Sequence, residues 1–377
     1  MNWKIPLFKI YSDDDDVEQV KEVIQSGMNW ATGPKVAELE SFIADYVGVK
    51  YAVTLNSGTS ALHAALLAHV IKSGDEIVVP SFTFIATANS PFFVGAKPIF
   101  ADIETDTYGL DPEDVKERIT KKTKAIIPVH VGGCSCKIRE LREIASDSNI
   151  LLIEDAAESL GAKIGNKKVG TFGDSAMFSF CGPKVITTGE GGVIVTESKD
   201  IYEKIKLLRS HGRADTKDYF STNEYMDYVS LGYNFRMSNI TAALGIAQLG
   251  KIDYVIQKRR EHAKYLTEKL NKVAPAVKTP LPPKGYYHLY QMYTIEVPNR
   301  DGLMNFLSEK GIMAKVYFLP VHHSHFYKNV LKYKPKLPVT EQTAERVLTL
   351  PMYPDLKKEE MNYMAECIGA YYQGKPR

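Results

Sequence analysis

Short apolar runs alternate with helical patterns through the first two-thirds of the chain. Residues 51–55 read as a buried strand, and residues 59–71 place apolar side chains at helical spacing. The same alternation predicts strands at 76–79, 97–100, 124–129, 150–153, 176–180 and 192–196, and helices at 84–94, 112–119 and 138–146. The strand at 192–196 could pair antiparallel. Because parallel strands joined by helices are covered on both faces, the sequence predicts an α/β fold with a mainly parallel sheet.

The pattern changes after about residue 250. A long charged helix is predicted at 252–273, and a proline-rich link follows at 279–285. A strand at 288–297, a helix at 301–310, a histidine-containing loop and a closing helix at 358–372 complete the chain. A chain of 377 residues is too long for one small core. We therefore predict residues 1–250 as an N-terminal segment and large domain, and residues 251–377 as a smaller α+β domain.

Composition excludes several classes of partner. The formal net charge of +2 gives no reason to expect binding to nucleic acid or to a membrane surface. No apolar run reaches the length of a membrane span, and the N-terminus lacks the pattern of a secretion signal. Four cysteines do not suggest a disulfide framework, so a cytoplasmic protein is predicted. The acidic run from Asp13 to Asp16 is interpreted as a solvated helix start.

An acidic residue and a lysine stand in prominent places around two predicted strands. Asp155 closes the apolar run that begins at residue 150, at the sheet edge where α/β proteins bind ligands. Lys184 lies in the loop between the next two strands, and a glycine-rich stretch, 189–192, follows it. Alone, Asp155 could be a helix cap or an ion-pair partner, and Lys184 a surface residue. Together they supply what pyridoxal phosphate (PLP) requires, a carboxylate facing its ring nitrogen and an amine for a Schiff base.

A third segment could bind the phosphate of such a cofactor. Ser57 is a good N-cap for the helix predicted after the first strand, and Gly58 allows close approach of a ligand to the backbone. The N–H groups of Gly58, Thr59 and Ser60 would then face an anion. Taken alone, the segment is better explained as an ordinary capped helix, and the motif gains weight only from the residues around it.

These motifs, in this order, resemble the DegT/DnrJ/EryC1/StrS family of fold-type-I, PLP-dependent sugar aminotransferases. The similarity runs from Ser26-Gly27 and the segment 29–34 to the last helix. It implies a mixed, mostly parallel seven-stranded sheet between helices, with a smaller C-terminal α+β domain. It also implies that Lys184 binds the cofactor covalently and that Asp155 pairs with the ring nitrogen. The remaining cofactor contacts that it implies come from Ser57, Gly58, Thr59, Ser179 and the stacking residue Phe84.

Two further positions follow from the resemblance. Glu158 matches a residue near the phenolic oxygen of the cofactor, and glutamate there is similar to enzymes that make 4-amino sugars such as GDP-perosamine. Beside Asp155, Glu158 could hold a proton and donate a hydrogen bond. Asn234 matches an asparagine that reaches the phosphate in the neighbouring subunit, which implies a homodimer with shared active sites. The sequence departs from the family pattern at Pro183 and within 129–134, but neither departure removes a required group.

Aromatic and cationic residues are expected around a large anionic substrate. The candidates are Trp30, His211, Arg213, Tyr317 and His322. Histidines at 322, 323 and 325 also suggest a metal site. We predict no metal, because their spacing fits no helical pair and no acidic residue is close in the sequence.

The predicted reaction is transamination of a nucleotide-linked 4-keto-6-deoxy sugar with L-glutamate as donor, giving a 4-amino sugar for surface polysaccharide. A 3-aminotransferase is an alternative. A sugar dehydratase of the same fold is another, although the resemblance implies a histidine in place of Lys184 for that activity. A catalytically silent, cofactor-binding regulator is the third.

Overall fold

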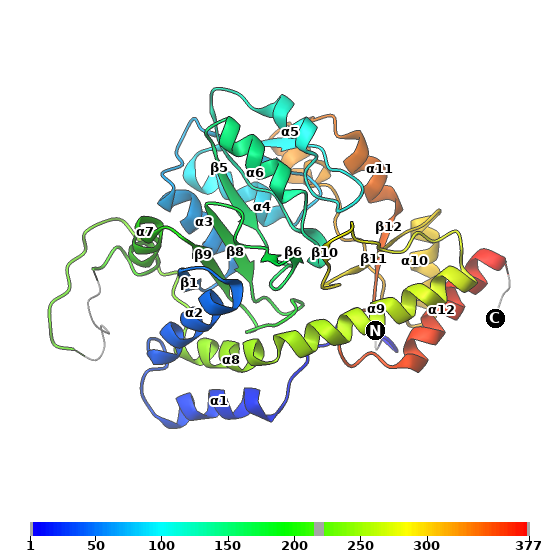
Figure 1. Ribbon diagram of the computed structural model, residues 1–377, viewed down its shortest axis with the longest axis horizontal. Coiled ribbons are helices and arrows are strands. Elements are labelled where there is room, and N and C mark those ends of the chain that lie inside the picture. Colours follow the sequence, from blue (N-terminus) through cyan, green and yellow to red (C-terminus); the bar gives the residue numbers. More distant parts are fainter. Residues whose placement is uncertain (1–2, 215–221, 375–377) are drawn as a thin grey trace.

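The computed structural model describes residues 3–214 and 222–374. A seven-stranded sheet with the order β1-β9-β8-β5-β4-β2-β3 lies at its centre (Figure 1). Antiparallel pairing joins β9 to β1 and to β8, and the other neighbours pair in parallel. The strands are β1 (Tyr51–Leu55), β2 (Glu76–Pro80), β3 (Lys97–Ala101), β4 (Thr123–Ile126), β5 (Leu151–Asp155), β8 (Ser175–Ser179) and β9 (Gly192–Thr196). The predicted mixed, mostly parallel sheet is confirmed.

Helices cover both faces of this sheet because successive strand residues point to opposite sides. On one side, Ile153 and Met177 pack in a core with α3 (Gly58–Ala68), α4 (Ile85–Asn89), the 3₁₀ helix η1 (Ser90–Val94) and α7 (Lys199–Arg209). On the other side, Phe178 packs against α2 (Pro34–Val47) and α8 (Asn239–Gly250). Leu152 on that same side packs near α5 (Pro112–Arg118) and α6 (Ile138–Asp147). The helix α1 (Asp14–Gln25) lies outside α8 (Figure 1).

A separate apolar core forms around the C-terminal elements. The two-stranded antiparallel sheet of β11 (Tyr293–Glu296) and β12 (Val347–Leu350) packs with α9 (Ile252–Val273), α10 (Arg300–Glu309) and α12 (Lys358–Gln373). The chain begins beside this unit, where Ile5 pairs with Ile312 (Figure 1). The α9 helix contributes residues to this core and to the core beneath the large sheet. The boundary at residue 250 stays a prediction.

Short elements complete the described structure. They are β6 (Lys163–Ile164), β7 (Lys167–Lys168), β10 (Tyr286–Tyr287), the 3₁₀ turns η2 (Val131–Gly133) and η3 (Val321–His323), the π-helical turn η4 (Phe326–Val330) and α11 (Pro338–Arg346). Among the described residues, no helix is both long enough and apolar enough to cross a membrane.

Two predicted elements differ most from the structure. The single helix expected at 84–94 divides into α4 and η1, with Pro91 in the first turn of η1, because proline has no N–H for a continuous helix. The strand expected at 288–297 is regular only over Tyr293–Glu296. Before it, Leu289 and Met292 donate their backbone N–H groups to the carbonyls of Gly133 and Gly132 instead of to a neighbouring strand.

The acidic run at the start of α1 is only partly solvated, contrary to its interpretation from the sequence. Asp13 caps the helix by accepting from the Asp15 N–H. Asp16 is buried, and it accepts hydrogen bonds from the side chains of Gln248 and Lys251. This charge therefore joins α1 to the end of α8, a contact that composition does not reveal.

Candidate active site

Eight of the predicted site residues that were assigned to a cofactor line one cavity of about 380 Å³. The cavity lies beyond the carboxyl ends of β1, β2, β5 and β8, where open α/β sheets bind ligands. Tyr317, one of the predicted substrate residues, lines it too, together with Phe318 and Lys315. The eight are Ser57, Gly58, Thr59, Phe84, Asp155, Glu158, Ser179 and Lys184.

The start of α3 forms one wall of this cavity. The Ser57 side chain caps the helix by accepting from the Ser60 N–H at 3.1 Å. Gly58 begins the helix, and a Cβ there would lie 3.2 Å from the Cβ of Ser179. The missing side chain therefore leaves the first-turn N–H groups and the Ser179 hydroxyl accessible together. This arrangement suits a phosphate group.

Asp155 ends β5 and is almost fully buried. The Thr87 hydroxyl donates to its Oδ2 at 2.7 Å, and the Ala157 N–H donates to its Oδ1 at 3.2 Å. Burial raises the pKa of Asp155 above its ordinary value, although these hydrogen bonds and the charge of Lys184 oppose the rise. A cationic ring nitrogen facing this carboxylate would offset the cost of burying its charge.

Lys184 and Glu158 form an ion pair inside the cavity. Lys184 Nζ lies 3.3 Å from Glu158 Oε1, and both side chains are largely shielded from solvent. The Gly132 N–H donates to the other Glu158 oxygen, Oε2, at 2.8 Å. Both oxygens of Glu158 are therefore acceptors in this structure. Its proposed role as a donor to the cofactor stays a prediction.

Contacts that the sequence did not reveal hold the lysine loop and its surroundings. Gln291, from the segment before β11, donates through Nε2 to the carbonyl of Pro183, next to Lys184. Thr87 lies one helical turn after Phe84, and this spacing could have indicated that both face the same site. Lys315 lies over the ring of Tyr317 at 4.8 Å from its centroid. No local pattern connects Gln291 or Lys315 with Lys184.

Phe84 lies at the mouth of the cavity with 60% of its surface exposed. Its ring centroid is 6.4 Å from that of Phe318, which comes from the loop after Tyr317. An aromatic face that is open to the cavity is available to stack on a planar ring.

Five predicted site residues do not line this cavity within a single chain. Trp30 is half exposed, and Arg213 is buried where it pairs with Tyr228. His322 is buried against Ser81. The backbone of His211 has a left-handed conformation with φ of 63°. The carbonyl of Asn234 accepts a hydrogen bond from the side chain of Asn56. The functional roles of all five stay predictions.

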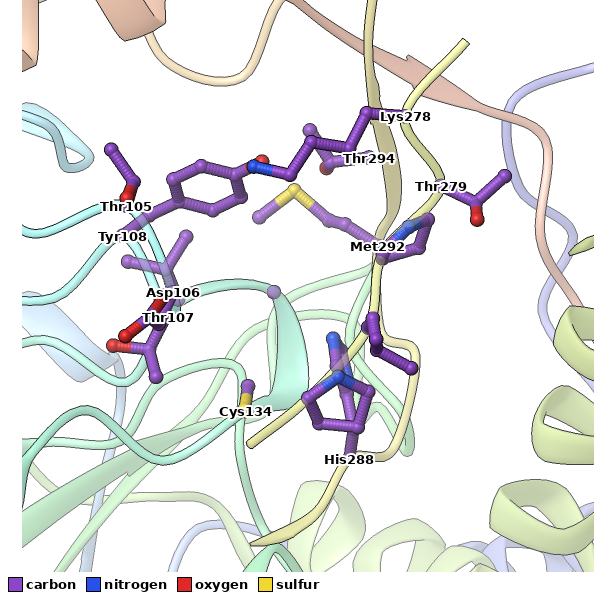
Figure 2. Close-up of a pocket in the computed structure, with 15 residues that line it drawn as sticks. Thr105, Asp106, Thr107, Tyr108, Cys134, Lys278, Thr279, His288, Met292 and Thr294 are labelled. Atoms are coloured by element: carbon purple, nitrogen blue, oxygen red, sulfur yellow. The ribbon is translucent and has the colours of Figure 1, made fainter. Parts of the chain in front are cut away.

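A second cavity of about 220 Å³ lies between the segments 105–108, 131–134 and 278–282 (Figure 2). Its lining residues all differ from those of the first cavity. Its charged residues are paired elsewhere, Asp106 with Lys137 and Lys278 with Glu296. This cavity therefore offers no unpaired charge to a ligand, and the candidate chemistry belongs to the first cavity.

The residues of the first cavity fit PLP. A helix N-terminus with a nearby hydroxyl is available for the phosphate, and a buried carboxylate for the ring nitrogen. An exposed aromatic ring can stack on the cofactor, and the Lys184 amine can bind its aldehyde. When bound, the cofactor supplies that aldehyde and an electron-accepting ring.

Comparisons with known proteins agree with this fit. The model of the DegT/DnrJ/EryC1/StrS aminotransferase family matches residues 11–369. The GDP-perosamine synthase of Escherichia coli O157:H7 is 37% identical, over 98% of this chain and 99% of that protein. Among solved structures, PseC of Helicobacter pylori, an aminotransferase of pseudaminic acid biosynthesis, superposes with a TM-score of 0.91 at 29% identity, covering 98% and 99% of the two chains.

The PLP form of Spr1654 from Streptococcus pneumoniae has a TM-score of 0.90 at 26% identity and covers 99% of each chain. The match thus extends over nearly the whole molecule, including every segment that lines the first cavity. The chain belongs to the DegT/DnrJ/EryC1/StrS aminotransferase family and is a PLP-dependent aminotransferase.

Proposed function

We propose that this enzyme transfers the amino group of L-glutamate to a nucleotide-linked 4-keto-6-deoxy sugar, producing a 4-amino sugar for polysaccharide biosynthesis. The observation that carries the proposal is the placement of Lys184, Glu158 and Asp155 in one cavity. Relatives that are 36–37% identical over nearly the whole chain are named GDP-perosamine synthase, which supports a sugar substrate aminated at C4. A further relative, 33% identical, is named for spore coat polysaccharide biosynthesis.

In the proposed reaction, the residues of the cavity have different roles. Lys184 is the basic group that can take a proton from the donor amino acid and return it within the cavity. Glu158 holds the Lys184 amine in place, and the Gly132 N–H fixes Glu158. Asp155 stabilises positive charge on the ring nitrogen, since its carboxylate is shielded from water.

We also propose that the enzyme works as a homodimer in the cytoplasm. Leu231 and Tyr225 keep 78% and 85% of their surfaces exposed, and Tyr228 and Val229 beside them are more than half exposed. Apolar surface of this extent is typical of an interface. The segment leads directly to Asn234, so a partner seated there would bring Asn234 near a shared site. All four cysteines are free, which fits a reducing compartment.

A substrate panel tests the proposed reaction. The PLP-loaded enzyme is incubated with L-glutamate and GDP-, UDP- and dTDP-linked 4-keto-6-deoxy sugars, and the products are identified by mass and by the position of the new amine. A 4-amino sugar from one of these nucleotides supports the proposal. Amination at C3, or loss of a hydroxyl without amine gain, would assign one of the alternative activities instead. Light scattering of the purified protein tests the dimer.

A further inference from the structure

The histidine-rich loop meets an acidic residue that is distant in the sequence. Glu341 lies in the first turns of α11, and its Oε1 is 3.3 Å from His322 Nε2. One ligand atom each from His322, His323 and Glu341 lies within 4.8 Å of the others. The sequence argument against a metal assumed that no acidic residue was near these histidines. The structure overturns that assumption.

We propose that His322, His323 and Glu341 form a binding site for one divalent transition-metal ion of the zinc class. Two imidazoles and a carboxylate are a ligand set that zinc accepts, with a water molecule in the fourth position. Around a tetrahedral zinc ion, neighbouring ligand atoms lie roughly 3.4 Å apart. The atoms of His322 and Glu341 already have this separation. His323 is exposed, so its side chain is free to turn by the small distance that remains.

The position of His322 is fixed by residues that do not contact the proposed ion. Its Nδ1 lies 2.6 Å from the Ser81 hydroxyl, just after β2, and its backbone N–H donates to the same oxygen at 3.1 Å. With a hydrogen on Nδ1 donated to Ser81, the lone pair of Nε2 points toward Glu341. Outer hydrogen bonds of this kind orient metal-binding histidines and select their tautomer.

Glu341 is also held in place from outside the site. Both oxygens of Asp102 accept hydrogen bonds at the start of α11, from the N–H groups of Val339 and Thr340 and from the Thr340 hydroxyl. These contacts fix the first turn of the helix that presents Glu341. Two ligands are therefore oriented in advance, while the exposed third leaves a path by which an ion can reach the site.

A metal ion here would tie together segments that border the cofactor cavity. His322 follows the loop of Tyr317 and Phe318, and Ser81 precedes Phe84 by three residues. Tyr317, Phe318 and Phe84 all line the cavity. Binding would therefore stabilise the mouth of the cavity without placing the ion among the reacting groups.

The test uses the full-length, PLP-loaded protein after treatment with a chelator. Co²⁺ is titrated as a coloured substitute for Zn²⁺, and the visible absorbance and the melting temperature are recorded for wild type, Glu341→Gln and His323→Ala. His325→Ala is the matched control, because His325 is an exposed histidine of the same loop outside the cluster. Zn²⁺ should displace Co²⁺ from the wild type.

We expect about one Co²⁺ per chain in the wild type and in His325→Ala, with a rise in melting temperature. In Glu341→Gln and His323→Ala, the affinity should fall by more than the roughly 10-fold to 100-fold loss that follows removal of an outer-shell partner. Equal binding by all four proteins, or no binding by the wild type, would overturn the proposal. Loss of binding in His325→Ala would overturn the assignment of the three ligands.

Discussion

Glu154 and Asp155 are adjacent carboxylates on one strand, yet their surroundings differ. Glu154 accepts backbone hydrogen bonds from Gly170, Phe172 and Gly173, and it faces His130 Nε2 at 3.0 Å. Burial opposes the ionisation of Glu154, but His130 and these N–H groups outweigh it and lower its pKa. Asp155 has fewer donors, and burial raises its pKa.

The comparison shows how the same residue class serves two purposes. Glu154 is a structural anion whose oxygens are fully used by the protein. Asp155 is a buried carboxylate for which the protein alone does not compensate, as expected for a group that meets a charged ligand. Strand geometry sends the two side chains to opposite faces of the sheet, and the partners on each face decide the outcome.

The largest expected effect is at the lysine that shares the cavity with Asp155. Lys184→Arg keeps a cation beside Glu158 but removes the amine that can bind an aldehyde. Turnover should fall by about 10³-fold or more, and borohydride should no longer fix the cofactor to the chain. Steady-state kinetics and peptide mass mapping measure both. Near-normal turnover of Lys184→Arg would show that the reaction does not depend on the Lys184 amine in the cavity shared with Asp155.

Asp155→Asn should lower the activity of the enzyme without lowering the stability of its fold. Loss of the charge that faces the ring nitrogen should reduce kcat by about 10²-fold to 10³-fold. Urea unfolding of the cofactor-free protein should show equal or greater stability, since a neutral amide avoids the cost of burying a charge. If Asp155→Asn unfolded easily while active when folded, the functional assignment of Asp155 would fail.

Glu154→Gln should show the opposite pattern. Three backbone N–H groups now donate to the two carboxylate oxygens, and an amide NH2 in place of one oxygen could not accept from them. His130 would also lose its ionic partner. We expect a loss of about 3 kcal/mol in the free energy of unfolding. Once folded, the variant should keep kcat within about tenfold of wild type. Unchanged urea unfolding would refute the structural role of Glu154.

Glu158→Gln is expected to have a smaller effect. The Gly132 N–H can still donate to the amide oxygen, but the charge beside Lys184 is lost. A decrease of about tenfold in kcat is expected, because Lys184 would be held less firmly. Kinetics and the visible spectrum of the cofactor-bound enzyme are the measurements. If neither changes, Glu158 has no part in the reaction.

The dependence of stability on pH should differ in sign between the two carboxylates. The lowered pKa of Glu154 gives a contribution that is complete above its ordinary value of 4.5 and is lost as pH falls through its folded-state pKa. The raised pKa of Asp155 has the reverse effect, a penalty that grows as pH rises above its ordinary value of 3.8. Unfolding of cofactor-free wild type, Glu154→Gln and Asp155→Asn from pH 3 to 7 (roughly the range spanned by carboxyl pKa values) compares these slopes. Parallel curves for the two variants would contradict the comparison.

Most of the large sheet was predictable because each strand carries its own apolar pattern. The strands at 51–55 and 192–196 and the helix at 252–273 begin and end where expected. The segment 288–292 was not predictable, because its backbone pairs with a distant glycine turn. The prediction of a single helix at 84–94 was wrong because it did not allow for Pro91, which has no N–H to donate in a continuous helix.

The candidate site was also predictable where it depends on local sequence patterns, and not where it depends on contacts between distant segments. The positions of residues adjacent to strand ends, such as Asp155, were predictable from the order of strands along the chain, since parallel strands end at one edge of a sheet. Lys315 lines the cavity, and Gln291 contacts the carbonyl of Pro183 next to Lys184. Both come from the C-terminal third of the chain, and no spacing in the sequence connects them with Lys184. Trp30, His211, Arg213 and Asn234 lie off the single-chain cavity, and their roles stay predictions.

The sequence by itself determined the fold class, the family and the identity of the lysine and carboxylate at the sheet edge. These depend on local periodicity and on the order of motifs, which are written along the chain. The tertiary structure alone decided that Glu154 is satisfied and Asp155 is not, and that Glu341 stands beside His322. The reason is physical: electrostatic and hydrogen-bonding partners act through space over a few ångströms, and folding brings them together from positions that sequence spacing does not relate.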